Sequence, residues 1–406
     1  MVILILLLVT LLGGGAVYYI FSTILDGRKK QAWFSSLDST VLLIEIPRTN
    51  DKKELSAEHM FASLHGILKS KNELKVHQEY QEHIGFEIIS VGNKIQFYIW
   101  TPTVLTQFVE GQVYAQYPEA QIKQIKPEDD YVHNIPEGHY RQVVEIGLTE
   151  DETLPIQTYQ SFEVDPLAGI TATLTKLESS TEILGIQILA RPVNDAWHKA
   201  SARKANSIKS GDSKSSVSKN SWLAQTTGAL WRPPEETGAA VKTEVSERDK
   251  TRISAIEEKS RKLGYQVKIR VLYSCPPDVQ LSARMKIQAL LGAFKQFNTT
   301  NLNGFAQVSS KLEDFEKYKS RSFFEKGFTL NIEELASLYH LPHSNVTTPG
   351  IVWARSRTGE PPSNLPIYTE GSLDISPIGV TTFRGDYQYF GLTRRDRGRH
   401  VYIIGQ

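Results

Sequence analysis

Two apolar runs separated only by Gly92-Asn93 constrain the fold more than any other feature of the chain. Residues 84–91 and 94–100 are rich in β-branched and aromatic side chains, and a Gly-Asn pair between such runs is typical of a tight antiparallel hairpin. Helical and strand patterns flank this hairpin in the order β-α-β-β-α-β, which predicts a ferredoxin-like unit over residues 39–135. The expected elements are strands at 40–46, 84–91, 94–100 and 120–125, and helices starting near Ser56 and spanning 103–117.

RNA-binding sheets share this element order, and they present aromatic and basic residues on an open face. Phe86, Phe97 and Ile99 are the candidates for such a face, but few Lys or Arg residues accompany them. Apolar sheet faces are more often covered by helices or by a neighbouring subunit. Nucleic-acid binding therefore remains an alternative function, behind a packing role.

The same order of elements recurs over residues 136–327, which predicts a second ferredoxin-like unit. In the third strand Tyr265, Val267 and Ile269 are expected to face inward, with Lys268 and Arg270 on the outward side. The expected elements are strands at 140–148, 182–190, 265–273 and 305–308, a helix at 165–177 and a helix opened by Pro276-Pro277-Asp278.

An insertion at 194–264 divides the second unit. It begins and ends as helix, and residues 206–243 between them are Ser- and Lys-rich, which predicts a flexible segment. A basic arm that contacts anionic headgroups or nucleic acid is one interpretation, and a solubilising linker is the commoner one. The basic residues are Lys199, Arg203, Lys204, Lys209, Lys214 and Lys219.

The N-terminus carries an apolar run over residues 1–25, followed by a basic linker at 26–38. As a helix the run would be about 37 Å long, enough for a bilayer core of about 30 Å. Arg28, Lys29 and Lys30 follow it and no basic residue precedes it, so the N-terminus is expected outside and the bulk of the chain in the cytoplasm. A single-pass protein of the cytoplasmic (inner) membrane is therefore predicted over a cleaved secretory signal.

Composition excludes some classes of function. The chain has 46 Lys and Arg against 45 Asp and Glu, so its net charge of +1 provides no global attraction to nucleic acid. The single cysteine, Cys275, excludes an intramolecular disulfide framework and a cysteine-based zinc site. His340 and His343 flank Leu341-Pro342, but two histidines do not form a metal site without further ligands. No metal ligand set is predicted.

Residues 328–406 have a different character. A short helix is predicted from Thr329 to Pro342, with Asn331 as cap and Glu334 completing a capping box. Pro- and Gly-rich passages follow it, then short strand candidates at 378–383 and 390–392. The sequence closes with a basic turn and an apolar strand, GRHVYIIGQ. A buried strand that leads into a glycine is typical of the approach to a phosphate-binding loop.

Three motifs in this order, EELASLYHLP, WARSR with PPSNLP, and GRHVYIIGQ, resemble the ATPases of type IV secretion and conjugative transfer in the HerA–FtsK superfamily. The resemblance implies a P-loop ATPase that uses ATP and Mg²⁺, assembles as a hexamer and translocates DNA or protein. Gly405 would be the first glycine of its nucleotide-binding loop. The Lys, the Ser/Thr and the acidic residue of the nucleotide motifs are absent from the 406 residues. No catalytic residue and no cofactor are therefore assigned, and these residues alone are not expected to hydrolyse ATP.

The sequence therefore predicts an α+β protein with a transmembrane helix, two ferredoxin-like units and the start of an ATPase domain at 328–406. Its predicted role is a membrane-anchored assembly region for a hexameric translocating ATPase, with secretion components, the bilayer and DNA as candidate partners. A stand-alone scaffold or adaptor, and a tethered nucleic-acid-binding module, are the alternatives. The candidate phosphate or inter-subunit contacts are Arg394, Arg395, Arg397 and Arg399, for which a solvated turn is an equal interpretation.

Overall fold

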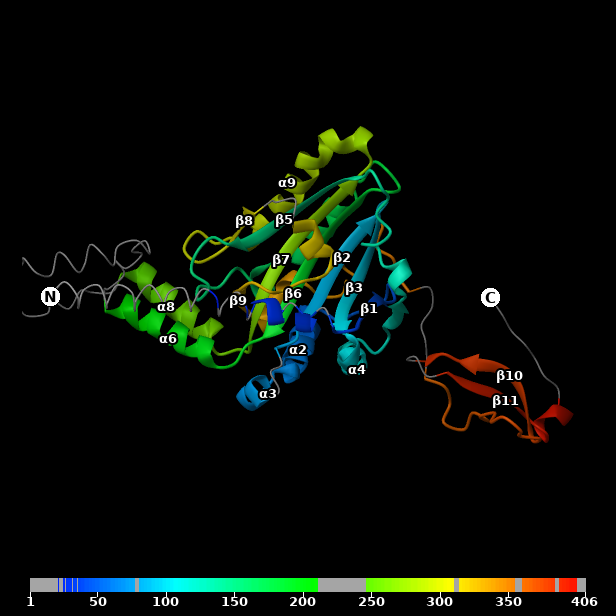
Figure 1. Cartoon of the computed structure of the whole chain (residues 1–406). Helices are drawn as coiled ribbons and strands as arrows, with labels where there is room; N and C mark the ends of the chain where they lie inside the picture. The colour runs from blue at the N-terminus through cyan, green and yellow to red at the C-terminus, as the bar shows by residue number, and fades with distance from the viewer. Residues whose placement is uncertain are drawn as a thin grey trace, which may run out of the picture.

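A computed structural model describes most of the chain and shows one large antiparallel sheet with helices (Figure 1). The described residues are 21, 25, 27–30, 32–34, 36–76, 80–210, 246–309, 314–354, 360–383 and 387–399. The strands are β1 Ser39–Glu45, β2 Ile84–Val91, β3 Lys94–Pro102, β4 Gln121–Ile125, β5 Tyr140–Leu148, β6 Ile183–Pro192, β7 Gly264–Cys275, β8 Phe305–Ser309, β9 Phe328–Asn331, β10 Ile375–Thr381 and β11 Gln388–Thr393. The helices are α2 Glu54–Leu64, α3 Lys71–Val76, α4 Thr106–Gln116, α5 Pro166–Leu174, α6 Ala196–Lys209, α8 Glu247–Lys259, α9 Ala283–Phe294, α10 Asp314–Lys319 and α11 Ile332–Leu338.

The sheet contains both predicted units. Its strand order is β4-β1-β3-β2-β6-β7-β5-β8, so each half has the ferredoxin-like order of its own four strands. The halves meet where β2 pairs antiparallel with β6, with Ile88 opposite Ile186. The α+β class is confirmed. However, the two units are not separate bodies, because they share one sheet and one core.

One face of the sheet, here called the helical face, is covered by α2 and α4 from the first half, α5 and α9 from the second, and α11. Phe86, Phe97 and Ile99 are buried on it, and the Phe86 ring lies 4.9 Å from that of Phe61 and 5.1 Å from that of Tyr339. The aromatic face on which RNA binding depended is therefore filled by helices rather than open.

The other face, here called the reverse face, is covered by residues 126–139 and by α10 with the chain that follows it. Tyr131 and Tyr318 pack there against alternate residues of the strands. Lys268 and Arg270, which were predicted to face outward, are only 4% and 2% exposed. The alternation in β7 was predicted correctly, but the outward side is a second buried layer, because distant chain covers it.

Residues 328–354 belong to this body rather than to a separate ATPase domain. The predicted helix at 329–342 begins instead as strand β9, which pairs with residues Gly264–Val267 of β7. Helix α11 then packs between α2 and α5, and so bridges the two halves. The capping box between Asn331 and Glu334 is confirmed.

The insertion extends from the β6–β7 hairpin, at the position where the first half has only Gly92-Asn93. Helices α6 and α8 pack together on a small core of their own that includes Ile208 and Ile256. The segment predicted to be flexible, 206–243, overlaps the last turn of α6 and from residue 211 onward lies outside the described residues.

The predicted transmembrane helix at 1–25 lies outside the described residues, except for Phe21 and Leu25. Within the part of the chain that the structure describes, no helix combines the length and apolar character needed to cross a bilayer. The predicted single-pass topology and the membrane localisation are therefore corrected, because they find no support there. The bilayer as a partner stays a prediction.

Strands β10 and β11 form a two-stranded sheet of their own, which lies apart from the large sheet in Figure 1. Residues 366–368 run along β11, where Tyr368 N–H donates to the Tyr389 carbonyl at 2.7 Å. The Phe390 ring lies against Gly379 on one side of this hairpin, so a Cβ at that position would displace the ring. The predicted strands at 378–383 and 390–392 thus form an antiparallel pair with slightly different bounds.

Candidate functional site

The four arginines predicted as phosphate or inter-subunit contacts lie on one turn directly after β11. Arg394, Arg395, Arg397 and Arg399 are all exposed. Within the described residues none of them forms an ion pair, and Arg397 Nη1 donates to Ser376 Oγ at 2.8 Å. Gly405, the predicted first glycine of a phosphate loop, lies outside the described residues. The four cations thus lie within six consecutive residues and are exposed to solvent.

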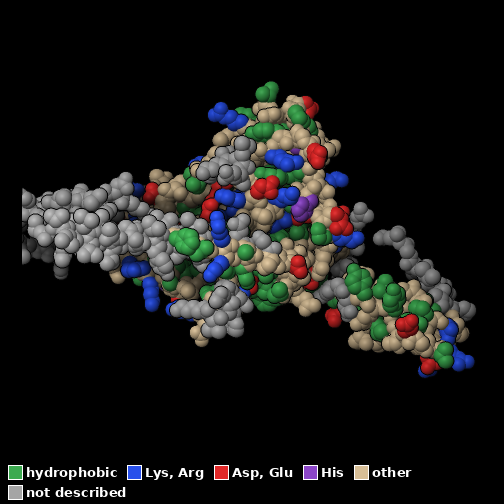
Figure 2. Space-filling model, in the orientation of Figure 1, with side chains coloured by type: hydrophobic (Ala, Val, Ile, Leu, Met, Phe, Trp, Pro, Cys, Tyr) green, Lys and Arg blue, Asp and Glu red, His purple; other side chains and the backbone are tan. Residues whose placement is uncertain are grey.

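The hairpin next to them exposes large apolar side chains. Val380 is paired directly with Tyr389, so these two side chains belong to one face. Ile378, at an irregularity of β10, and Tyr387, just before β11, are exposed as well. Tyr387 is 72% exposed and Ile378 is 61% exposed. Figure 2 shows hydrophobic side chains over the hairpin and basic ones at its far end. An isolated two-stranded hairpin is only marginally stable in water, so a covering partner is expected.

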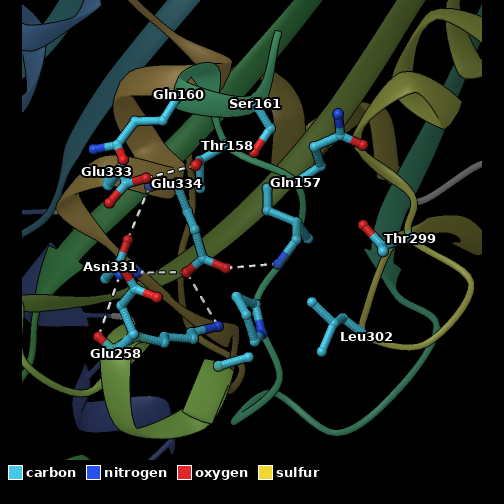
Figure 3. Close-up of a pocket in the computed structure, with 14 residues that line it drawn as sticks. Gln157, Thr158, Gln160, Ser161, Glu258, Thr299, Leu302, Asn331, Glu333 and Glu334 are labelled. Carbon is cyan, nitrogen blue, oxygen red and sulfur yellow. Dashed lines mark hydrogen bonds and ion pairs between the residues drawn. The ribbon is translucent and has the colours of Figure 1, made fainter. Parts of the chain in front are cut away.

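A polar cleft of about 330 Å³ lies between α8, α11 and residues 155–161 (Figure 3). At its base Lys259 Nζ lies 3.1 Å from Glu334 Oε2, and both side chains are fully buried. Lys259 also donates to the carbonyls of Glu152, Leu154 and Thr329, at 2.8, 3.3 and 3.1 Å. All the hydrogen-bond donors of Lys259 are thus engaged within the protein, and its charge is paired with Glu334, so this lysine is not placed to bind a substrate.

Glu334 is satisfied in the same way. Its Oε1 accepts from Ile156 N–H at 2.9 Å, and its Oε2 accepts from Asn331 N–H at 2.8 Å. At the edge of the cleft Lys262 Nζ binds Glu58 at 2.6 Å and Glu333 at 2.5 Å. The cleft therefore joins the insertion, α2 and α11 through paired charges, and it shows no arrangement of nucleophile and base.

A second buried network lies under the reverse face. Arg321 donates to Glu87 Oε1 at 2.9 Å and to Asp130 Oδ2 at 2.7 Å, and all three side chains are almost fully buried. Tyr131 donates to Glu87 as well, at 3.0 Å, and Gln187 does so at 2.8 Å. This network attaches residues 126–139 and 314–325 to the centre of the sheet, so its role is structural.

The third cluster contains the two histidines that the sequence analysis set aside. His340 Nε2 lies 2.9 Å from Asp165 Oδ1, and His343 Nε2 lies 3.0 Å from Asp165 Oδ2. Burial by itself would raise the pKa of Asp165, but the charge of His340, its hydrogen bond and the close contact of His343 outweigh burial and hold that pKa well below its usual range. Burial likewise acts to lower the pKa of His340, and the Asp165 carboxylate reverses this and raises it.

Sequence reasoning missed Asp165 and Glu54, the acidic members of this cluster, because they precede the histidines by more than a hundred residues. Asp165 does carry a local signal. It precedes Pro166 at the start of a helical pattern, and in the structure its carboxylate caps α5 by accepting from Leu167 N–H at 2.7 Å. That signal identifies a helix cap, and it does not indicate a histidine partner.

Comparison with known proteins adds a family but no activity. Residues 25–354 match the model of a family described as Domain of unknown function (DUF8128). The match covers the large sheet with its helices and ends before the β10–β11 hairpin. No curated protein matches the chain.

Proposed function

The chain belongs to the DUF8128 family, and from its own residues we propose that it is an assembly region for an oligomeric, translocating P-loop ATPase. In this proposal residues 39–354 form the assembly domain, and the β10–β11 hairpin is the first part of the ATPase fold. The four arginines contact phosphate groups of a nucleotide, on the same subunit or on a neighbouring one. The substrate, DNA or protein, is transported by the ATPase rather than by the assembly domain.

One observation carries this proposal: the hairpin exposes apolar side chains, and it is followed by four arginines that form no ion pair within the described residues, the last of them inside the GRHVYIIGQ segment. The apolar face needs a cover, and a buried strand that ends in a glycine is what precedes a phosphate loop. Arginine binds phosphate well because its planar guanidinium donates two parallel hydrogen bonds. The family match ends at residue 354, which also favours a division between an assembly domain and the segment that follows.

The first test reads the coding DNA beyond the Gln406 codon. We expect an in-frame Gly-rich loop that ends in Lys-Ser or Lys-Thr. The protein encoded by that longer frame should hydrolyse ATP and form nucleotide-dependent oligomers, with a hexamer expected from the resemblance, measurable by light scattering. A stop codon at that position, together with no nucleotide-dependent association with any P-loop protein, would contradict the proposal and favour a stand-alone adaptor.

A paired substitution tests the hairpin itself. Val380→Ser with Tyr389→Ser removes the apolar cross-strand pair, so we expect loss of nucleotide-dependent oligomers and of ATP turnover by at least about 10-fold, while the assembly domain unfolds at an unchanged temperature. Val104→Ser is the matched control, because Val104 is 78% exposed on the first half of the large sheet and should tolerate the change. Equal effects of the two variants would show that the hairpin has no special role.

A further inference from the structure

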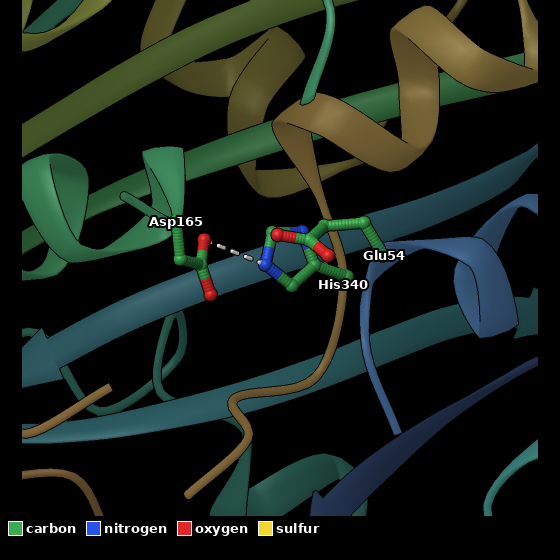
Figure 4. Close-up of side chains that lie close together, drawn as sticks. All are labelled: Glu54, Asp165 and His340. Atoms are coloured by element: carbon green, nitrogen blue, oxygen red, sulfur yellow. Dashed lines mark hydrogen bonds and ion pairs between the residues drawn. The ribbon is translucent and has the colours of Figure 1, made fainter. Parts of the chain in front are cut away.

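We propose that Glu54, Asp165 and His340 form a binding site for one zinc ion that closes the seam between the two halves of the sheet (Figure 4). The inference does not rest on the proposed function, because it concerns only the DUF8128 body. The ligand atoms of the three residues all lie within 4.8 Å of one another. A tetrahedral zinc site with bonds of about 2.0–2.1 Å has ligands about 3.3 Å apart, so a small rotation of the Glu54 side chain completes it.

The three ligands come from three parts of the chain. Glu54 is the first residue of α2 in the first half, and Asp165 caps α5 in the second half. His340 follows α11, the helix that packs between those two. An ion at this point would therefore hold both halves and the α11 segment together.

The histidine is already oriented as a metal ligand. His340 is fully buried, and its Nδ1 lies 2.8 Å from the Ala336 carbonyl, to which it donates. Metal-binding histidines commonly donate their second ring N–H to a backbone carbonyl, which directs the lone pair of the other nitrogen at the ion. Nε2 points at Asp165 in Figure 4, and zinc would replace the proton between them.

His343 has a different part in the site. Its Nδ1 accepts a hydrogen bond from Asn345 N–H at 3.2 Å, so its proton is on Nε2, which faces Asp165 Oδ2 at 3.0 Å. That contact lacks the alignment of a hydrogen bond, and Oδ2 has no other partner within the described residues. His343 is thus a positioning residue for the Asp165 carboxylate, and it is not itself a ligand.

The charge and access of the site also suit a divalent ion. Two carboxylates with a neutral imidazole balance a charge of +2 and combine the oxygen and nitrogen donors that zinc accepts. A cleft of about 370 Å³ reaches Glu54, Asp165 and His343 from solvent. This cleft provides an entry path and room for a water as the fourth ligand.

The test uses the full 406-residue chain, stripped with a chelator and then titrated with Zn²⁺, with Co²⁺ as the spectroscopic probe. We expect one high-affinity ion per chain, a visible Co²⁺ absorption of a four- or five-coordinate site, and a melting temperature raised by roughly 5 °C at a 100-fold excess of Zn²⁺ over its Kd. Mg²⁺ and Ca²⁺ should produce no comparable shift, because they prefer more oxygen ligands.

Substitutions identify the ligands. Glu54→Gln should weaken zinc binding by more than about 100-fold, and His343→Gln by about 10–100-fold through Asp165. Glu163→Gln is the matched control, because Glu163 lines the same cleft without reaching the ligand cluster. Asn is also a common helix cap, so the Asp165→Asn variant should keep the fold of the protein while it loses zinc binding.

Two results would overturn the proposal. One is failure of the folded, chelator-stripped wild-type chain to take up Zn²⁺ in the titration. The other is binding that survives unchanged in Glu54→Gln, which would place the ion on other histidines. If Asp165→Asn or His340→Gln fails to fold, the zinc affinity of Glu54→Gln still decides the outcome, because Glu54 is partly exposed and its substitution should leave the fold intact.

Discussion

The two faces of the large sheet each bury a histidine, and the pKa values of these two histidines are shifted in opposite directions. On the helical face, His340 contacts the Asp165 carboxylate, which raises its pKa above the ordinary value. On the reverse face, His83 stacks on Trp100, with ring centroids 4.9 Å apart, and burial lowers its pKa to about 3. Arg191 and Arg270 lie near His83 and act in the same direction. Burial alone favours the neutral ring, and one carboxylate reverses that preference.

The same difference extends to how each face is covered. Helices with apolar stripes cover the helical face, so its core is stabilised by contact area. Irregular chain and the short helix α10 cover the reverse face, and they are attached to the sheet by the ion pairs of Arg321. We therefore expect the stability of the reverse face to respond most to loss of charge, and that of the helical face to respond most to loss of volume.

The largest expected effect is on the reverse face. Arg321→Met leaves Glu87 and Asp130 buried without a cation, so unfolding free energy should fall by about 3–5 kcal/mol in urea denaturation. Lys250→Met is the control, because its pair with Glu247 on α8 is exposed on both sides, and a change within about 0.5 kcal/mol is expected there. A loss below about 1 kcal/mol for Arg321→Met would show that the reverse face is not held by charge.

On the helical face, Leu335→Ala should cost about 2–5 kcal/mol, because Leu335 is fully buried on α11 and a cavity would remain. The loss should be the same at pH 5 and pH 8 and at low and high salt, unlike that of Arg321→Met. Denaturation curves at the four conditions measure it. A loss that varied with pH would mean that the two faces are coupled.

The histidines should give pH dependences of opposite sign. The folded-state pKa of His83 is about 3, below its unfolded value of about 6.5, so the unfolded chain takes up the proton first as pH falls. The free energy of unfolding should therefore fall between pH 6.5 and 3, by about 2 kcal/mol at pH 5. His83→Gln should remove this pH dependence, which denaturation curves measured across that pH range would show. The folded-state pKa of His340 is raised, so its contribution is complete below pH 6.5 and is lost as pH rises through the folded value. A His83→Gln variant that kept the full acid slope would assign it to other groups.

The smallest expected effect concerns the helix cap of α11. Asn331→Ala removes the side chain that accepts from Glu334 N–H at 2.9 Å and should cost about 1 kcal/mol in thermal unfolding. Asn331→Asp, which keeps an acceptor, should recover most of that loss. Equal losses in the two variants would indicate that the contact of Asn331 Nδ2 with the Lys259 carbonyl matters more than the cap.

Apolar periodicity predicted most of the helical face. The bounds of β2 at 84–91 and β5 at 140–148 agree with the predicted ones, because alternating side chains with turns at both ends leave little choice of register. The capping box of Asn331 and Glu334 was also predicted correctly, because it is a local contact between residues three positions apart.

What the sequence does not show is which distant segments meet. Arg270 was predicted to be solvated, because nothing near it in sequence indicates that residues 317–322 will cover it. The pairing of β2 with β6 and the meeting of Asp165 with His340 are contacts of the same kind, the second across 175 residues. Periodicity describes one element at a time, so a site assembled from several elements stays hidden.

The contacts of Arg321 also concern the order in which the protein is made. Its partners Glu87 and Asp130 precede it by 234 and 191 residues. A ribosome that adds about 5–20 residues per second needs roughly 12–47 s to pass from Glu87 to Arg321. During that interval the two carboxylates lack their cation, and burying them unpaired is unfavourable. In a nascent chain stalled before Arg321, the reverse face of the strands should therefore stay exposed to solvent and accessible to proteases or chaperones. Synthesis of residues 314–325, which cover that face, would end the exposure.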